Sequence, residues 1–327
     1  MCIWIEEWKT RLQLSDSYDK IISMDFIYLN DADGRKPKKL TDVSVSNTAS
    51  ELVSGLKQKM APLWSDHIDN IHIDQNVSTH VAYIVDTVAK KHKSISVYVD
   101  AHDVFWINDA VKNGRLSLDD MSYPNYATRH QFVFEPQKVT VFDPEKELVI
   151  ADDGSIPVVI YCHTSRLTGQ VFPLESIFKR IKDKHPEAVC IADGAQTIGG
   201  QKIYHLEYTD AFIVTTSKFI GAEMNLGLCQ FSENFRKKYL TDGYVYPSIE
   251  LSEYSRELYS TDQSLNGFTG LDFESYIKGL RMYILDKFSK TGLSSHIYRV
   301  QDQVPHVVTL LVGDKSATES VIKSLEK

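Results

Sequence analysis

The sequence lacks the features of a membrane protein or of a nucleic-acid-binding protein. Its 327 residues include no run of about 18 apolar residues, so the sequence predicts no transmembrane helix. Lysine and arginine total 36 against 44 aspartates and glutamates, which gives a formal net charge of −8. Surfaces that bind nucleic acid or anionic lipid are rich in basic residues. We therefore expect neither a nucleic-acid partner nor a membrane partner.

Cysteine is also scarce. The four cysteines form no CxxC pair, and Cys162 and Cys190 lie in apolar runs, where cysteine usually packs as a small hydrophobic side chain. The first residues are charged too early for a signal peptide and offer no small-residue cleavage site. These features favour the reducing cytoplasm. The histidines and aspartates within 66–74 match no zinc or calcium spacing, and no P-loop or HExxH motif is present, so we predict no metal site.

Apolar runs alternate with amphipathic segments along the middle of the chain. Four runs rich in β-branched residues predict buried strands, at 94–101, 156–165, 188–196 and 211–217. Segments with helical spacing lie at 78–92 and 173–186. Continuous apolar strands separated by helices are typical of a mostly parallel sheet covered on both faces. The sequence therefore predicts an α/β fold.

The sequence predicts a large domain followed by a small one. After a helical segment at 272–288, a single strand-like run is followed by a single helical segment, which suggests an abbreviated small domain. We predict an N-terminal segment over 1–45, a large domain over 46–285 and a shortened C-terminal domain over 286–327.

Polar residues stand where each predicted strand ends. In parallel α/β sheets, ligands bind beyond the carboxyl ends of the strands. The residues at these ends are Asp100 and His102, then His163, Thr164 and Ser165, then Asp193 and Gln196, and finally Thr215, Ser217 and Lys218. Each of them could equally be polar because it meets solvent. Four such ends on one sheet favour a shared site.

Lys218 and Asp193 suggest the chemistry of that site. A lysine amine in a desolvated pocket has a lowered pKa and can form a Schiff base, although a lone lysine at a strand end is usually a solvated charge. Pyridoxal phosphate needs such a lysine for its aldehyde and an aspartate for its pyridinium nitrogen. Ser78 and Thr79 begin a predicted helix, where free N–H groups and the helix dipole favour a phosphate.

Three motifs, in a fixed order, carry a family resemblance. They are HTSRLTGQVFPLESI at 163–177, IADGAQTIGG at 191–200 and DAFIVTTSKFIGAEMNLG at 210–227. The ordered set, with Asp193 and Lys218 placed 25 residues apart, resembles the class V aminotransferase family, which includes cysteine desulfurases, selenocysteine lyases and isopenicillin epimerase-like enzymes. The resemblance extends roughly over residues 70–285. It implies a pyridoxal-phosphate-dependent transferase of the aspartate aminotransferase fold, known as fold type I.

The resemblance implies a role for each matching residue. Lys218 would form the Schiff base with pyridoxal 5'-phosphate and later move a proton at the substrate Cα, while Asp193 would hold the pyridinium nitrogen. Gln196 would hydrogen-bond the phenolic oxygen of the ring. His102 would stack on the ring, or equally serve as a structural histidine. The residues that would bind the phosphate are Ser78, Thr79, Thr215 and Ser217.

The resemblance also bears on assembly and on the neighbourhood of the cofactor. Thr269 resembles the position that reaches the phosphate of a partner subunit, which implies a homodimer with an intersubunit active site. His163 and Ser165 correspond to the strand-end segment beside the cofactor.

The sequence departs from the family in two places. Ser217 precedes the lysine where the family often has histidine, and the C-terminal region has no counterpart of the substrate-binding arginine or of the mobile cysteine of desulfurases. Ordinary cysteine desulfurase activity is therefore not expected. The sequence favours a pyridoxal-phosphate enzyme that acts on an amino acid or an amino-acid-derived substrate, by transamination or by elimination or lyase chemistry, in a specialised biosynthetic pathway. The alternative is a catalytically degenerate relative that serves as a binding or scaffold subunit.

Overall fold

A computed structural model describes the central part of the chain. It covers residues 49–64, 71–74, 77–101, 139–165, 168–197, 207–218, 222 and 226–240, and a few positions between 261 and 310. The helices are α2 (Ala49–Trp64), α3 (Val77–Lys91), α5 (Leu174–Lys184) and α6 (Glu233–Tyr239). The strands are β1 (Ile71–Asp74), β2 (Ile95–Asp100), β3 (Val139–Phe142), β4 (Ile156–Cys162), β5 (Val189–Asp193), β6 (Ala211–Thr215), β7 (Gly227–Phe231), β8 (Ile297–Tyr298) and β9 (Thr309–Leu310).

Seven of these strands form one sheet, in the order β1-β7-β6-β5-β4-β2-β3. The neighbours from β3 through β2, β4 and β5 to β6 pair in parallel. β7 runs antiparallel to both β6 and β1, so β1 points the same way as β6. The mostly parallel sheet that the sequence predicted is confirmed. β8 and β9 pair antiparallel in a separate two-stranded sheet.

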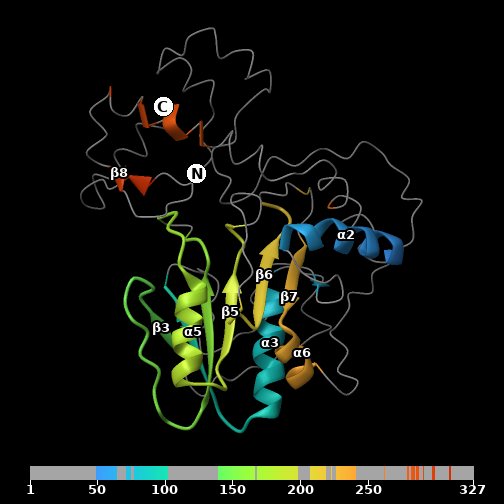
Figure 1. The fold of residues 1–327 in the computed structure, drawn as a ribbon, viewed down its shortest axis with the longest axis vertical. Coiled ribbons are helices and arrows are strands. Elements are labelled where there is room, and N and C mark those ends of the chain that lie inside the picture. The colour runs from blue at the N-terminus through green and yellow to red at the C-terminus, as the bar shows by residue number, and fades with distance from the viewer. Residues whose placement is uncertain are drawn as a thin grey trace, which may run out of the picture.

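Helices cover both faces of the sheet, and each face has its own hydrophobic core (Figure 1). Successive side chains of a strand point to opposite faces. In β4, Tyr161 packs in the core shared with α2 and α5, whereas the neighbouring Ile160 packs in the core shared with α3 and α6. β2, β5 and β6 are buried at every position, which explains why their sequences are apolar runs without alternation.

Two of the helices show how local sequence sets these layers. In α5, Leu174, Phe178 and Ile181 fall on one side at helical spacing, and all three are buried. In α6, the Ser232 side chain at the N-cap accepts a hydrogen bond from the Phe235 backbone N–H at 3.1 Å. Among the described helices, none combines the length and the hydropathy that a bilayer-spanning segment requires.

The parallel strands bring their carboxyl ends to one edge of the sheet, and Figure 1 shows the arrowheads of β5 and β6 at the same end. Cys162 of β4 is in register with Asp193 of β5, which is in register with Ile213 of β6. We call this side of the sheet the carboxyl edge and the opposite side the amino edge. The domain limits predicted above stay predictions, because 1–45 and most of 286–327 lie outside the described residues.

Candidate active site

Asp193 is the last residue of β5, at the carboxyl edge, and its side chain is only 6% exposed. Its Oδ1 accepts a hydrogen bond from the Ala195 backbone N–H at 2.8 Å. Its backbone carbonyl accepts one from the His163 N–H, also at 2.8 Å. These two bonds fix a buried carboxylate at the point where the strand turns away from the sheet.

The turn after Asp193 requires a glycine for reasons of space. A Cβ atom on Gly194 would lie 2.3 Å from Cζ of Phe212, so no larger residue fits against that ring. The Gly194 N–H donates to the carbonyl of Ile213 at 2.7 Å, which ties the turn to β6. The close approach of turn and strand keeps Asp193 beside the end of β6.

Gln196 lies in the same turn and is buried. The next residue, Thr197, joins it to the end of β4. The Thr197 Oγ1 lies 3.1 Å from Nδ1 of His163 and 3.1 Å from the hydroxyl of Thr164. Burial lowers the pKa of His163 to about 4, so its ring is neutral at physiological pH. A buried polar network therefore supports the turn that carries Asp193 and Gln196.

Lys218 follows the end of β6 by three residues and is half-buried. The loop that carries it is anchored at Thr216, whose backbone N–H donates to the carbonyl of Leu226 at 3.0 Å. The Leu226 N–H donates to the Thr216 hydroxyl at 2.9 Å, and the Ala222 N–H to the Thr216 carbonyl at 3.0 Å. The amine thus stands on a loop whose base is fixed to the sheet.

Hydroxyl groups flank this loop. The Oγ atoms of Thr215 and Ser217 lie 3.3 Å apart, at the carboxyl end of β6. Ser78 and Thr79 lie in the first turn of α3, as the sequence predicted. Strand register brings that turn to the same edge, because Asp74, three residues before α3, pairs with Gly227, and Gly227 pairs with Thr215.

The structure thus brings seven of the nine candidate residues to one edge of the sheet. They are Ser78, Thr79, Asp193, Gln196, Thr215, Ser217 and Lys218. His102 and Thr269 lie outside the described residues. Sequence reasoning assigned no role to Thr197 or Thr216, although both lie within the motifs, because their contacts come from the fold.

Asp100 differs from the other strand-end residues. It is fully buried, and its Oδ2 accepts hydrogen bonds from the Cys162 backbone N–H at 3.1 Å and from the Cys162 thiol at 2.8 Å. The carboxylate therefore links the ends of β2 and β4. The expectation that Asp100 faces the site shared by the other strand ends stays a prediction.

The donor set suits pyridoxal phosphate. A buried carboxylate on β5 matches a cationic ring nitrogen, and a half-buried amine at the end of β6 matches an aldehyde. A helix start and two neighbouring hydroxyls match a phosphate. Within the described ranges, no group of three or more histidine, cysteine, aspartate or glutamate side chains is placed to hold a metal ion.

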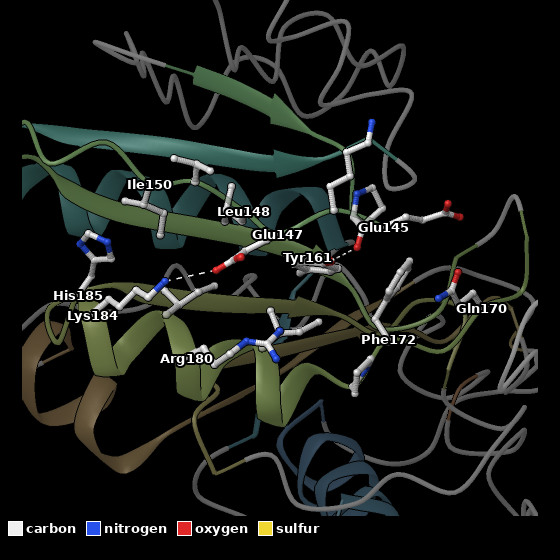
Figure 2. Close-up of a pocket in the computed structure, with 16 residues that line it drawn as sticks. Glu145, Glu147, Leu148, Ile150, Tyr161, Gln170, Phe172, Arg180, Lys184 and His185 are labelled. Atoms are coloured by element: carbon white, nitrogen blue, oxygen red, sulfur yellow. Dashed lines mark hydrogen bonds and ion pairs between the residues drawn. The ribbon is translucent and has the colours of Figure 1, made fainter.

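A separate groove lies on the α5 face of the sheet, with a volume of about 760 Å³ (Figure 2). The loop before β4 and helix α5 form its walls. An ion pair between Lys184 and Glu147 spans 3.3 Å, and the Tyr161 hydroxyl donates to the Pro144 carbonyl at 2.5 Å (Figure 2). None of the described candidate residues is among those that line it, so this groove is not formed by the candidate site.

Residues 142–235, which include β4, β5, β6, Asp193 and Lys218, match the family described as Aminotransferase class-V. The predicted class V aminotransferase family is confirmed over this segment. No curated protein sequence matches the chain. The class V match agrees with the expectation of a pyridoxal-phosphate enzyme.

Several solved structures share the fold. One titled NifS-like protein has a TM-score of 0.62 at 12% identity and covers 91% of this chain and 85% of its own. A mutant of C-DES with glycine covalently linked to its PLP cofactor has a TM-score of 0.57 at 17% identity, with coverages of 85% and 76%. The ureidoglycine–glyoxylate aminotransferase of Bacillus subtilis has a TM-score of 0.56 at 15% identity, with coverages of 88% and 76%. The predicted fold class is confirmed.

Proposed function

We propose that the protein is a pyridoxal-phosphate-dependent enzyme that acts on an amino acid or an amino-acid-derived substrate. The observation that carries the proposal is the placement of Asp193 and Lys218 at the carboxyl ends of neighbouring parallel strands. The hydroxyls beside Lys218 and the start of α3 at the same edge support it. The class V match over this segment supports it independently.

Pyridoxal phosphate, when bound, supplies an aldehyde that reacts with amines and a ring that withdraws electrons from the substrate Cα. In the proposal, the amine of Lys218 would hold the cofactor through its aldehyde. The same amine, when not joined to the cofactor, would remove a proton from the substrate Cα or return one to it. The Asp193 carboxylate would accept a hydrogen bond from the protonated ring nitrogen, which would keep that ring cationic.

The remaining candidate residues would bind and orient the cofactor. Gln196 donates to the phenolic oxygen from its buried place in the turn after β5. The groups that hold the phosphate are the hydroxyls of Ser78, Thr79, Thr215 and Ser217 and the free backbone N–H groups of α3. His102 would stack on the ring, and Thr269 would reach the phosphate of a second subunit in a homodimer. In the same proposal the enzyme works in the cytoplasm.

The reaction that follows proton removal is transamination or an elimination. Both kinds of enzyme occur among proteins with this fold, which include an aminotransferase and a cystine C-S lyase. The alternative is a non-catalytic relative that serves as a binding or scaffold subunit. That alternative requires the lysine, the carboxylate and the hydroxyls to stand together without a cofactor to hold, so we favour the enzyme.

The proposed covalent link between Lys218 and the cofactor can be tested directly. Purified protein mixed with pyridoxal phosphate should develop a visible absorption band, and reduction with borohydride should attach the cofactor to one peptide, identified by mass spectrometry as the one that contains Lys218. Lys218→Ala should abolish both signals. Lys179→Ala is the matched control, because Lys179 is exposed on α5 and pairs with Asp183. A wild-type protein that stays colourless and unlabelled would favour the scaffold.

A further inference from the structure

His80 is a buried polar residue that the proposed function does not use. It lies in the first turn of α3, directly after Ser78 and Thr79, and it is 0% exposed. Its imidazole donates a hydrogen bond to the backbone carbonyl of Gly227. Burial lowers the pKa of His80 to about 3, so the ring makes this bond in its neutral form.

The acceptor of that bond stands at a junction of the sheet. Gly227 is the first residue of β7, and it pairs with Asp74 of β1 on one side and with Thr215 of β6 on the other. α3 packs against all three of these strands. The bond from His80 therefore attaches the first turn of α3 to the point at which three strands are in register.

The two halves of the proposed phosphate site lie on either side of this bond. Ser78 and Thr79 immediately precede His80 on the helix. Ser217 and Lys218 follow Thr215, the partner of Gly227, by two and three residues. A buried hydrogen bond between helix and strand restricts how far the helix start can shift along or away from the end of β6.

We propose that His80 is a positioning residue, which holds the phosphate-binding start of α3 in register with the Lys218 end of β6 through its bond to Gly227. This inference rests on the proposed function. His80 touches no reacting atom in it. Its effect is expected on the phosphate of the cofactor and not on the covalent link at Lys218.

A comparison of two cofactors separates these effects. Pyridoxal carries the same aldehyde and ring as pyridoxal phosphate but lacks the phosphate. The dissociation constant of each is measured by titration of the visible absorption band of the whole protein. The ratio of the two constants reports what the phosphate site contributes, and a general loss of folding changes both constants alike.

His80→Phe removes the donor and retains a ring of similar size. We expect it to weaken the binding of pyridoxal phosphate about tenfold, because one positioning hydrogen bond is lost. The binding of pyridoxal should stay unchanged. Thr87→Val is the matched control, because it removes a buried hydrogen bond of the same helix, from Thr87 to the Tyr83 carbonyl, that does not reach β7. It should leave the ratio as in the wild type.

Two amide variants provide a rescue. Asn places its N–H near the position of Nδ1 of histidine and Gln near that of Nε2, so only the variant that can reach Gly227 should retain the wild-type ratio. This comparison stands even where His80→Phe fails to fold. If His80→Phe weakened the binding of both cofactors alike, the proposed role of His80 would be wrong. It would also be wrong if the ratio of the two dissociation constants were the same in both amide variants. A wild-type protein that binds neither cofactor would instead overturn the proposed function.

Discussion

One aspartate and one lysine lie at each end of the strand pair β5–β6, but the two pairs have different surroundings. At the amino edge, Asp210 stands before β6 and bonds Lys182 of α5 at 2.7 Å and the Cys190 backbone N–H at 2.8 Å. At the carboxyl edge, Asp193 and Lys218 stand with hydroxyls and a helix start beside them. An acid and an amine at a strand end are therefore not enough to indicate a site. The hydroxyl groups and the helix start beside Asp193 and Lys218 distinguish the candidate site from the pair at the amino edge.

The largest expected effect comes from replacing one aspartate at each edge. Asp193→Asn should lower catalytic activity about a hundredfold or more, because it removes the charge that stabilises the cationic ring, and should change the free energy of unfolding little. Asp210→Asn should affect the free energy of unfolding and not the catalytic activity. It weakens a buried pair at the amino edge, and we expect a loss of about 1–2 kcal/mol in the free energy of unfolding with activity retained.

These outcomes are measured by steady-state kinetics and by urea unfolding of both variants. Burial raises the pKa of Asp210 in spite of Lys182, so the Asn variant gives up less than a fully ionised pair would. If Asp210→Asn abolished activity while Asp193→Asn did not, the assignment of the carboxyl edge as the active site would be wrong.

Much of the fold follows from the sequence because its strands are buried on both faces. The apolar runs at 94–101, 156–165, 188–196 and 211–217 contain β2, β4, β5 and β6, and the predicted segments at 78–92 and 173–186 contain most of α3 and all of α5. The short strand β7 is also largely buried, and Cys229 within it is a buried thiol. The direction of β7 could not be predicted, because a short buried strand has the same composition whether its neighbour is parallel or antiparallel.

The site could be predicted only in part. Asp100 and Asp193 each end an apolar strand, and of the two only Asp193 lies within a motif that carries the family resemblance. The contact that Asp100 makes could not be predicted, because it depends on β2 lying beside β4, where the Cys162 N–H and thiol donate to Asp100. The role inferred for His80 was equally hidden, because its acceptor is a backbone carbonyl on a strand distant in the sequence.

The pH dependence of stability provides a second test, because it depends on buried histidines, one of which lies at the carboxyl edge. Burial lowers the pKa of His163 and His72 to about 4 and that of His80 to about 3, from 6.5, and His163 stands at the carboxyl edge. The positive charges of Lys57 and Arg236 add to the effect on His72. Between pH 6.5 and 4 the unfolded chain takes up protons at these residues and the folded chain does not, so stability falls as the pH falls.

We expect a loss on the order of 2–3 kcal/mol for each of these histidines across that range. Urea unfolding between pH 7 and pH 4 measures it. His163→Gln removes one titrating group and should flatten the dependence. An unchanged slope in His163→Gln would show that this ring does not stay neutral in the folded protein.

The smallest effect concerns two glycines, one at each edge. Gly194 follows β5 at the carboxyl edge and has no room for a Cβ, because Cζ of Phe212 would lie 2.3 Å away. Gly154 precedes β4 at the amino edge with φ +77 and nothing within 4 Å of the position of a Cβ. Alanine at Gly194 therefore meets a steric conflict, and alanine at Gly154 meets only backbone strain.

Both substitutions should lower the free energy of unfolding, by about 1–3 kcal/mol at Gly194 and about 1 kcal/mol at Gly154. A smaller side chain at position 212 separates the two causes. In a Phe212→Leu background, Gly194→Ala should cost at least about 1 kcal/mol less than it does alone, and Gly154→Ala should cost the same as before. Equal costs of Gly194→Ala in the two backgrounds would mean that the turn after Asp193 is not held against Phe212. The carboxylate at the carboxyl edge would then lack the support that the packing gives it.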